Sequence, residues 1–160
     1  MYMHQAMKEP DKDKFIAAMV EEMDAQLKGG NFLLILRSKV PKGATILPVV
    51  WQMKCKRQIQ TWEVYKWKAR LNIDGSCQVK GWDYWDTYAP VATWGSICLI
   101  LAKAIIQGWH SKQIDFIMAY TQAPVEQDMY MEIPKGFEVE GDGDYVLQIH
   151  KNIYGQKQAG

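Results

Sequence analysis

Two neighbouring stretches of the chain, residues 51–59 and 64–73, alternate between polar and apolar side chains. Alternation with a period of two is typical of β-strands that have one wet face and one dry face. The polar positions share a positive charge at Lys54, Lys56, Lys66, Lys68 and Arg70. Only residues 60–63 separate the two stretches. The pattern therefore predicts an antiparallel hairpin whose wet face is basic and whose dry face is rich in aromatic side chains.

A four-residue spacing of apolar side chains predicts an amphipathic helix over residues 11–28. Its apolar stripe contains Phe15, Met19, Met23 and Leu27. Pro10 stands where a proline is tolerated at a helix start, and Gly29 and Gly30 end the pattern. We interpret this segment as a helix that docks on the rest of the fold and carries no chemistry.

A second helix is predicted over residues 94–107, where Thr93 can cap the first turn and Gly108 ends the pattern. Its side chains are apolar nearly all the way round. A helix of this kind is usually enclosed by other elements. The sequence therefore predicts that this helix is buried. Shorter runs predict strands over residues 31–36, 128–133 and 145–150.

The run at residues 113–118 predicts a strand that carries one carboxylate, Asp115, between Ile114 and Phe116. Pro124 is predicted to end regular structure after this run. A carboxylate in a mostly buried strand is costly to desolvate unless it is paired or binds a metal. Asp115 therefore has two interpretations: a structural residue that pairs with a lysine or caps a turn, or a metal ligand.

Charge is distributed unevenly along the chain, although the formal net charge is only +1. Residues 54–80 hold seven basic and two acidic side chains, whereas residues 124–144 hold seven acidic and one basic. A sheet face with many positive charges repels itself unless a polyanion neutralises it. The basic hairpin is therefore a candidate phosphate-binding surface, with Trp62 and Trp82 as candidates for base stacking. A solvated lysine-rich face that protects a sheet edge is the alternative.

Cysteines and apolar runs limit the remaining classes of protein. The three cysteines, Cys55, Cys77 and Cys98, show no short spacing, which argues against a disulfide framework or a zinc site. The longest apolar run, residues 97–106, is interrupted by Lys103 and is too short to span a bilayer. We expect a soluble intracellular protein without a membrane partner or a disulfide partner, and the pattern does not distinguish a cytoplasmic particle from the nucleus.

Four segments together resemble the reverse transcriptase domain of copia-type retrotransposons. They are VYKWKARLN (64–72), YWDTYAPVAT (84–93), GWHSKQIDFIMAYTQAPVEQDMYMEIPKGF (108–137) and NIYGQKQAG (152–160). Each motif is weak alone, but their order and spacing also match. The resemblance covers roughly residues 8 to 160.

The resemblance implies an α+β fold of the right-hand polymerase type, with an antiparallel sheet and packed helices. Residues 8–93 correspond to fingers and residues 94–160 to part of the palm, within one partial domain over residues 1–160. Asp115 falls on the first catalytic aspartate, which binds Mg²⁺ (with Mn²⁺ as a substitute) together with the backbone carbonyl of Phe116. Tyr120 falls on the aromatic gate that selects deoxynucleotides over ribonucleotides.

The resemblance also implies which residues contact nucleotide and nucleic acid. Lys68 and Arg70 lie in the fingers strand that contacts the incoming triphosphate, and either of the two can make the contact. The nucleotide-side motif near the C-terminal end contains Tyr154, Gly155 and Gln158. The nucleic-acid-binding candidates are Lys54, Lys56 and Lys66. The partners implied are an RNA or DNA template–primer, a deoxynucleoside triphosphate and the remainder of a retrotransposon polyprotein.

One departure from the family leaves two hypotheses about function. The chain has no Asp-Asp pair, so we expect it to stop before the family's Tyr-x-Asp-Asp turn, which supplies further metal carboxylates. On the first hypothesis the chain is the N-terminal half of an RNA-directed DNA polymerase and is inactive alone. On the second it is a non-catalytic retroelement remnant whose basic hairpin binds nucleic acid or another partner.

Overall fold

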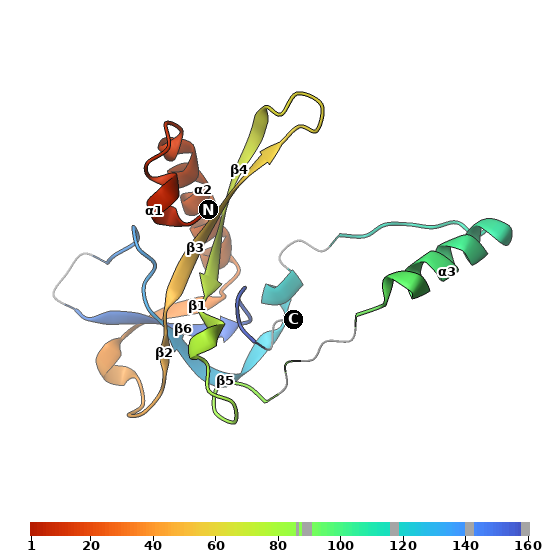
Figure 1. Cartoon of the computed structure of the whole chain (residues 1–160). Helices are drawn as coiled ribbons and strands as arrows, with labels where there is room; N and C mark the ends of the chain where they lie inside the picture. Colours follow the sequence, from red (N-terminus) through yellow and green to blue (C-terminus); the bar gives the residue numbers. More distant parts are fainter. Residues whose placement is uncertain (86, 88–90, 116–118, 140–142, 158–160) are drawn as a thin grey trace.

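The computed structural model describes residues 1–85, 87, 91–115, 119–139 and 143–157. Helices and strands both contribute to the fold, which is α+β as predicted (Figure 1). In chain order the elements are α1 (Met3–Ala6), α2 (Lys12–Lys28), β1 (Phe32–Leu36), η1 (Arg37–Lys39), β2 (Ile46–Leu47), β3 (Val49–Arg57), β4 (Val64–Ile73), η2 (Gly75–Cys77), α3 (Trp94–Ile106), η3 (Ala119–Gln122), β5 (Pro124–Met131) and β6 (Tyr145–Lys151). None of the helices in the described ranges is long and apolar enough to cross a membrane.

Strands β3 and β4 form the predicted antiparallel hairpin. The register places Lys54 opposite Lys68 and Lys56 opposite Lys66. Because side chains alternate between the two faces of a strand, all four lysines share one face. The opposite face is buried at Trp51, Met53, Ala69 and Leu71. The prediction of a basic wet face is confirmed. The dry face is buried at Trp51 and partly buried at Trp67, but Tyr65, the third aromatic side chain predicted for this face, is exposed.

Helix α2 covers the dry face of the hairpin, as the four-residue spacing predicted. Its side chains Phe15, Ala18, Met19 and Met23 are buried in the same cluster as the dry face of β3 and β4. The last residue of the predicted stripe, Leu27, is instead exposed. At the start of the helix, the indole nitrogen of Trp67 on β4 donates a hydrogen bond to a carboxylate oxygen of Asp11. Helix and hairpin are therefore joined by apolar packing and by one polar contact.

A second sheet has the strand order β1-β6-β5-β2. The pairs β1–β6 and β5–β6 are antiparallel, but β2 runs parallel to β5. The prediction of an antiparallel sheet is therefore wrong at this edge, and the sheet is mixed. Strands β1 and β6 agree with prediction to within one residue at each end.

Strand β5 begins at Pro124, which was predicted to end regular structure. Pro124 lies opposite Lys151 on β6, and the register is irregular from Pro124 to Met129. A proline fits here because the first residue of a strand can lack a ladder hydrogen bond. The strand therefore starts four residues before the predicted start at Asp128.

The predicted strand around Asp115 is not observed in its described part. Residues 111–115 have no regular structure, and Ile114 and Asp115 are both exposed. The rest of that run, residues 116–118, lies outside the described residues. A strand needs a neighbour to pair with its backbone groups, and neither described sheet includes this segment.

Helix α3 has the predicted cap but not the predicted burial. The backbone nitrogen of Ser96 donates to the Thr93 hydroxyl at 3.2 Å, and Gly108 ends the segment with a positive φ of 66°. No described side chain of α3 is buried, and Ile105 is 82% exposed. Figure 1 shows the helix standing apart from both sheets. An apolar sequence indicates that a helix requires cover, but it does not indicate which surface supplies it.

Candidate nucleotide and nucleic-acid interface

The basic face of the hairpin holds five cations, and none of them forms an ion pair with the described residues. We define the basic face as Lys54, Lys56, Lys66, Lys68 and Arg70. Both ion pairs found in the described ranges belong to Arg37, which contacts Glu132 at 2.6 Å and Asp144 at 2.8 Å. Directly opposed like charges destabilise a strand pair. The register therefore imposes a cost at Lys54–Lys68 and Lys56–Lys66, and at Lys68 the carboxylate of Glu22 on α2 offsets part of this cost.

The repulsion between these cations affects the pKa of Lys68. Partial burial lowers the pKa of Lys68, and the positive charges of Arg70 and Lys56 lower the pKa further. Both causes disfavour the charged ammonium group in the folded state. A negatively charged ligand on the basic face would remove part of this penalty, because it would compensate the repulsion between neighbouring cations.

Arg70 lies against an aromatic ring from the C-terminal part of the chain. Its guanidinium carbon is 5.3 Å from the ring centroid of Tyr154. The Nε atom of Arg70 is buried and has no hydrogen-bond partner among the described atoms. The structure thus brings together Arg70 and Tyr154, two residues that the resemblance had implied separately.

The turn that carries Tyr154 is hydrogen-bonded to the end of β4 and packs closely against it. The backbone nitrogen of Ile73 donates to the carbonyl of Tyr154 at 2.8 Å. The backbone nitrogen of Lys157 donates to the Gln78 side-chain oxygen at 2.7 Å. Gly155 has a φ of +92°, and a methyl group added there would lie 2.1 Å from the carbonyl oxygen of Ile73. Gly155 is therefore required for close packing of this turn against β4.

We expect Gly155→Ala to lower the free energy of unfolding by roughly 3 kcal/mol or more, since it adds a backbone overlap to an unfavourable φ. Gly43→Ala is the matched control, because Gly43 also has a positive φ of 90° but no atom within 4 Å of the added methyl group. It should cost only about 1–2 kcal/mol. Urea denaturation of both variants measures the difference. Equal losses at the two glycines would show that Gly155 is not closely packed.

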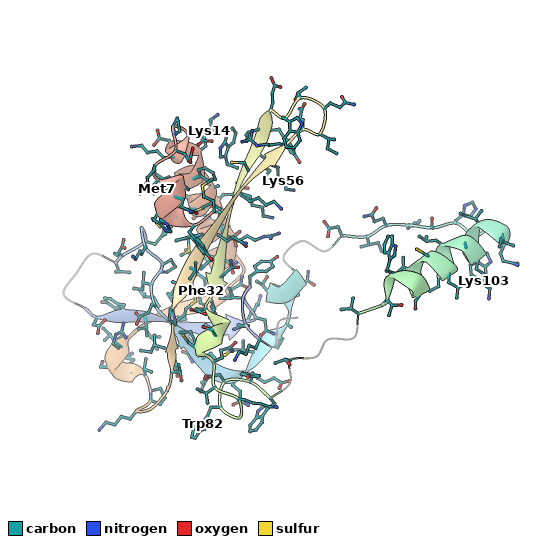
Figure 2. The ribbon with its side chains drawn as sticks, in the orientation of Figure 1. Met7, Lys14, Phe32, Lys56, Trp82 and Lys103 are labelled. Carbon is teal, nitrogen blue, oxygen red and sulfur yellow. The ribbon has the colours of Figure 1, made fainter. Side chains whose placement is uncertain are left out.

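Trp62 and Trp82 were both predicted to lie near the basic face, but only Trp62 does so (Figure 2). Trp62 lies in the hairpin connection and is 72% exposed. Trp82 is also exposed, but Figure 2 shows it at the opposite end of the molecule from Lys56. Trp62 therefore remains a candidate for base stacking beside the basic face, whereas the proximity predicted for Trp82 is wrong.

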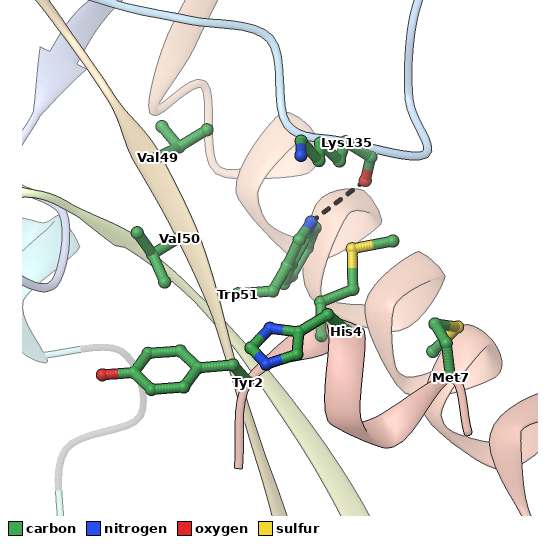
Figure 3. A pocket seen from close by; sticks show the side chains of 8 residues that line it. Tyr2, His4, Met7, Val49, Val50, Trp51 and Lys135 are labelled. Atoms are coloured by element: carbon green, nitrogen blue, oxygen red, sulfur yellow. Dashed lines mark hydrogen bonds between the residues drawn. The ribbon is translucent and has the colours of Figure 1, made fainter. Parts of the chain in front are cut away.

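A separate hollow of about 540 Å³ lies between α1, β3 and the segment around Lys135 (Figure 3). Its walls are mostly apolar, with contributions from Met3, Met7 and Trp51. The Trp51 indole nitrogen already donates to the carbonyl of Lys135 at 3.2 Å. Sequence reasoning missed this hollow because its walls come from segments that carry no chemical motif.

Comparison with known proteins identifies the family. Residues 35–160 match the family model described as reverse transcriptase (RNA-dependent DNA polymerase). The chain belongs to the reverse transcriptase family. Three relatives are Retrovirus-related Pol polyproteins: transposon TNT 1-94 of Nicotiana tabacum (34% identical), and transposons RE2 and RE1 of Arabidopsis thaliana (35% and 33% identical). The resemblance to copia-type elements is thereby confirmed.

Each of these matches covers 97% of this chain but only 10–11% of the relative. The chain therefore spans about a tenth of the length of the curated relatives that it matches. No solved structure matches the chain. The relatives place this reverse transcriptase segment among parts of larger polyproteins.

Membership in the reverse transcriptase family implies a general dependence on divalent cations. Among the described residues, however, no three His, Cys, Asp or Glu side chains come together as possible metal ligands. Asp115 is exposed and has no ion pair or hydrogen bond with the described part of the basic face. One carboxylate cannot hold two cations in register. The described residues of this reverse transcriptase segment therefore do not fit a two-cation site.

The remaining candidate residues are only partly described. Phe116 and Gln158 lie outside the described residues. Tyr120 belongs to η3, which lies against β6, but its side chain is outside the described part of the structure. The structure therefore unites the basic face with Tyr154 and Gly155, and it leaves the predicted roles of Asp115, Phe116, Tyr120 and Gln158 as predictions.

Proposed function

We propose that this chain forms part of an RNA-directed DNA polymerase from a copia-type retrotransposon polyprotein, with its basic face turned toward phosphates. Lys54, Lys56 and Lys66 contact the template–primer, whereas Lys68 and Arg70 contact the incoming deoxynucleoside triphosphate. The observation that carries this proposal is the set of opposed cations on one face of β3 and β4, none of which forms an ion pair with the described residues.

Physical chemistry supports a phosphate ligand on this face. Opposed lysines destabilise the hairpin, so their placement is better explained by a ligand than by folding. A polyanion would neutralise several of these charges at once and release its own counter-ions. The planar guanidinium of Arg70 suits a phosphate group because it can donate two parallel hydrogen bonds.

The residues of the palm-like part enter the proposal through the family resemblance. We assign Asp115 and the carbonyl of Phe116 as ligands of Mg²⁺, or of Mn²⁺ as a substitute, together with carboxylates that the described residues do not supply. Tyr120 is assigned as the gate beside the sugar, and Gln158 as a residue beside the template and nucleotide. The division into fingers (residues 8–93) and part of the palm (residues 94–160) belongs to the same proposal.

Binding without catalysis is the second candidate function. The observation that favours it is that the described residues contain no group of three metal-ligating side chains. On this proposal the basic face still binds nucleic acid, but the chain does not transfer nucleotides. Template-dependent incorporation distinguishes the two candidates, because only the first expects it when the missing carboxylates are present.

The purified chain should bind an RNA–DNA primer–template with strong dependence on salt. If Lys54, Lys56 and Lys66 contact duplex phosphates, the slope of log K against log salt concentration should approach roughly −3, because each neutralised duplex phosphate contributes about −0.9. Fluorescence anisotropy with a labelled duplex measures this slope from about 50 to 300 mM KCl, a range over which the Debye length falls from roughly 14 to 6 Å. Salt-independent binding would support the solvated-face interpretation instead.

A further inference from the structure

The contact between Arg70 and Tyr154 has a role beyond the phosphate binding proposed above. We propose that Tyr154 is a positioning residue, which holds the guanidinium of Arg70 against its ring so that the terminal nitrogens of Arg70 face an anionic group of the triphosphate type. The inference rests on the proposed function, since it assigns an orientation to a cation of the same site. Its basis is the 5.3 Å distance between guanidinium carbon and ring centroid, together with the enclosed Nε atom.

Arg70 needs an external constraint because its neighbours repel it. Lys68 lies on the same face of β4, and the charge of Arg70 is one of the causes that disfavour a protonated Lys68. No carboxylate among the described residues pairs with Arg70. An aromatic face attracts a cation without neutralising it. A tyrosine ring can therefore fix the guanidinium and still leave its charge available to a ligand, which a carboxylate would not do.

The ring of Tyr154 is itself well placed to act as a fixed support. Its backbone carbonyl accepts a hydrogen bond from Ile73, on the same strand as Arg70. The next residue, Gly155, fits against Ile73 at a distance that excludes any side chain. The turn that carries Tyr154 is thus attached to the strand that carries Arg70, which limits movement of the ring relative to the guanidinium.

Enclosure of Nε also determines which donors of Arg70 remain. A guanidinium has five N–H donors in a fixed planar fork. The Nε–H donor is buried against the chain without an acceptor. The four N–H groups of the terminal nitrogens are therefore the donors that a ligand can use, and their paired geometry matches two oxygens of one phosphate.

Three variants separate ring support from general packing. Tyr154→Phe keeps the aromatic face, whereas Tyr154→Leu keeps a large apolar side chain without a π-system. Tyr65→Leu is the matched control, because Tyr65 is an exposed tyrosine on the same strand as Arg70 and lies outside the proposed site. If Tyr154 acts through its ring, only Tyr154→Leu should alter Arg70.

The first measurement detects the support itself, without any ligand. In ¹H–¹⁵N spectra of the 160-residue chain, the Nε–H signal of Arg70 is assigned by its loss in Arg70→Gln. We expect slow exchange of this proton with water in the native protein, in Tyr154→Phe and in Tyr65→Leu. We expect fast exchange in Tyr154→Leu, because removal of the ring opens the side chain to solvent.

The second measurement tests the consequence for binding, with inorganic tripolyphosphate as the probe in isothermal titration calorimetry. Tyr154→Leu should weaken binding roughly 3- to 10-fold, the range expected for a cation–π contact of intermediate exposure. Tyr154→Phe and Tyr65→Leu should leave affinity unchanged. In an Arg70→Gln background, Tyr154→Leu should have no additional effect, because a residue that acts through Arg70 needs Arg70 to be present.

The outcomes distinguish the inference from the function on which it rests. Slow exchange of the Arg70 proton in Tyr154→Leu would overturn the inference, whatever the binding data show. Fast exchange without weaker binding, or a Tyr154→Leu effect that persists in Arg70→Gln, would also overturn it while leaving the proposed function intact. A native chain that binds neither tripolyphosphate nor primer–template would overturn the proposed function, and the positioning role with it, even if the proton is protected.

Discussion

Replacing Lys66 and Lys68 by glutamate should abolish primer–template binding and leave the hairpin at least as stable as before. Loss of the Lys66 contact with phosphate, a charge-assisted hydrogen bond, corresponds to about 1.5–3 kcal/mol of binding free energy, which is a loss of roughly 10- to 100-fold. The introduced carboxylates repel phosphates and increase this loss. We therefore expect no measurable binding at 150 mM KCl, close to a Debye length of about 8 Å.

The expected gain in stability follows from the register of the hairpin. Lys66 lies opposite Lys56, and Lys68 lies opposite Lys54. Each substitution converts a repulsive pair into an attractive one, which changes stability by roughly 0.2–1 kcal/mol per pair. Substitution of Lys68 also removes a cation whose pKa is lowered by burial and by its positive neighbours, although it gives up the attraction between Lys68 and Glu22. Urea denaturation should therefore show an unchanged or higher midpoint.

A charge-matched control separates local from overall effects. Lys39→Glu with Lys42→Glu makes the same change in net charge at two exposed residues of the connection between β1 and β2. This control should retain most of the binding and should not stabilise the protein. Equal loss of binding in both double variants would show that only the total charge matters. Loss of stability in the Lys66 and Lys68 variant would show that these lysines serve the fold.

Asp115→Asn should reduce DNA synthesis by orders of magnitude without destabilising the protein. The test uses a chimera in which this chain replaces the matching segment of the Pol polyprotein from tobacco transposon TNT 1-94, 34% identical over 155 residues. Loss of a carboxylate that holds a catalytic cation removes several kcal/mol of transition-state stabilisation, or on the order of 1,000-fold in rate. Primer extension on an RNA template with Mg²⁺ or Mn²⁺ measures the rate.

Stability should be unaffected because Asp115 is exposed and forms no ion pair with the described residues. Asp24→Asn, a change of another exposed carboxylate on α2, is the control and should leave synthesis intact. Full activity of the Asp115→Asn chimera would remove Asp115 from the catalytic site. The 160-residue chain alone should give no extension, since its described residues assemble no group of metal ligands.

The hairpin could be predicted from sequence because the decisive information is local. Alternation assigns each side chain of a strand to one face, and the short connection at residues 60–63 determines its partner. The spacing of Phe15, Met19 and Met23 similarly identified the buried side of α2. In both cases the apolar face finds its cover in the adjacent part of the chain.

The errors arose where the outcome depends on distant segments. The residues of α3 are apolar, but no described sheet face covers them. The run at Asp115 has strand-like composition, yet neither described sheet pairs with its described part. The contact of Arg70 with Tyr154 depends on a turn that packs against β4 at Gly155. The pattern of polar and apolar residues does not predict packing between segments so far apart in the sequence. The sequence motif could place both residues in one family site, but it could not show that they touch.

The alternation of side chains along β4 limits which insertions and deletions mutated copies of this retrotransposon sequence can tolerate. A one-codon insertion or deletion within β4 keeps the reading frame but moves every following side chain to the other face of the strand. Lysines would then point at α2. Ala69 and Leu71, which are buried in the present structure, would point at solvent. A two-codon change restores the faces and only shifts the cross-strand partners. Among in-frame length variants that still fold, even-numbered changes in this strand should therefore far outnumber odd-numbered ones.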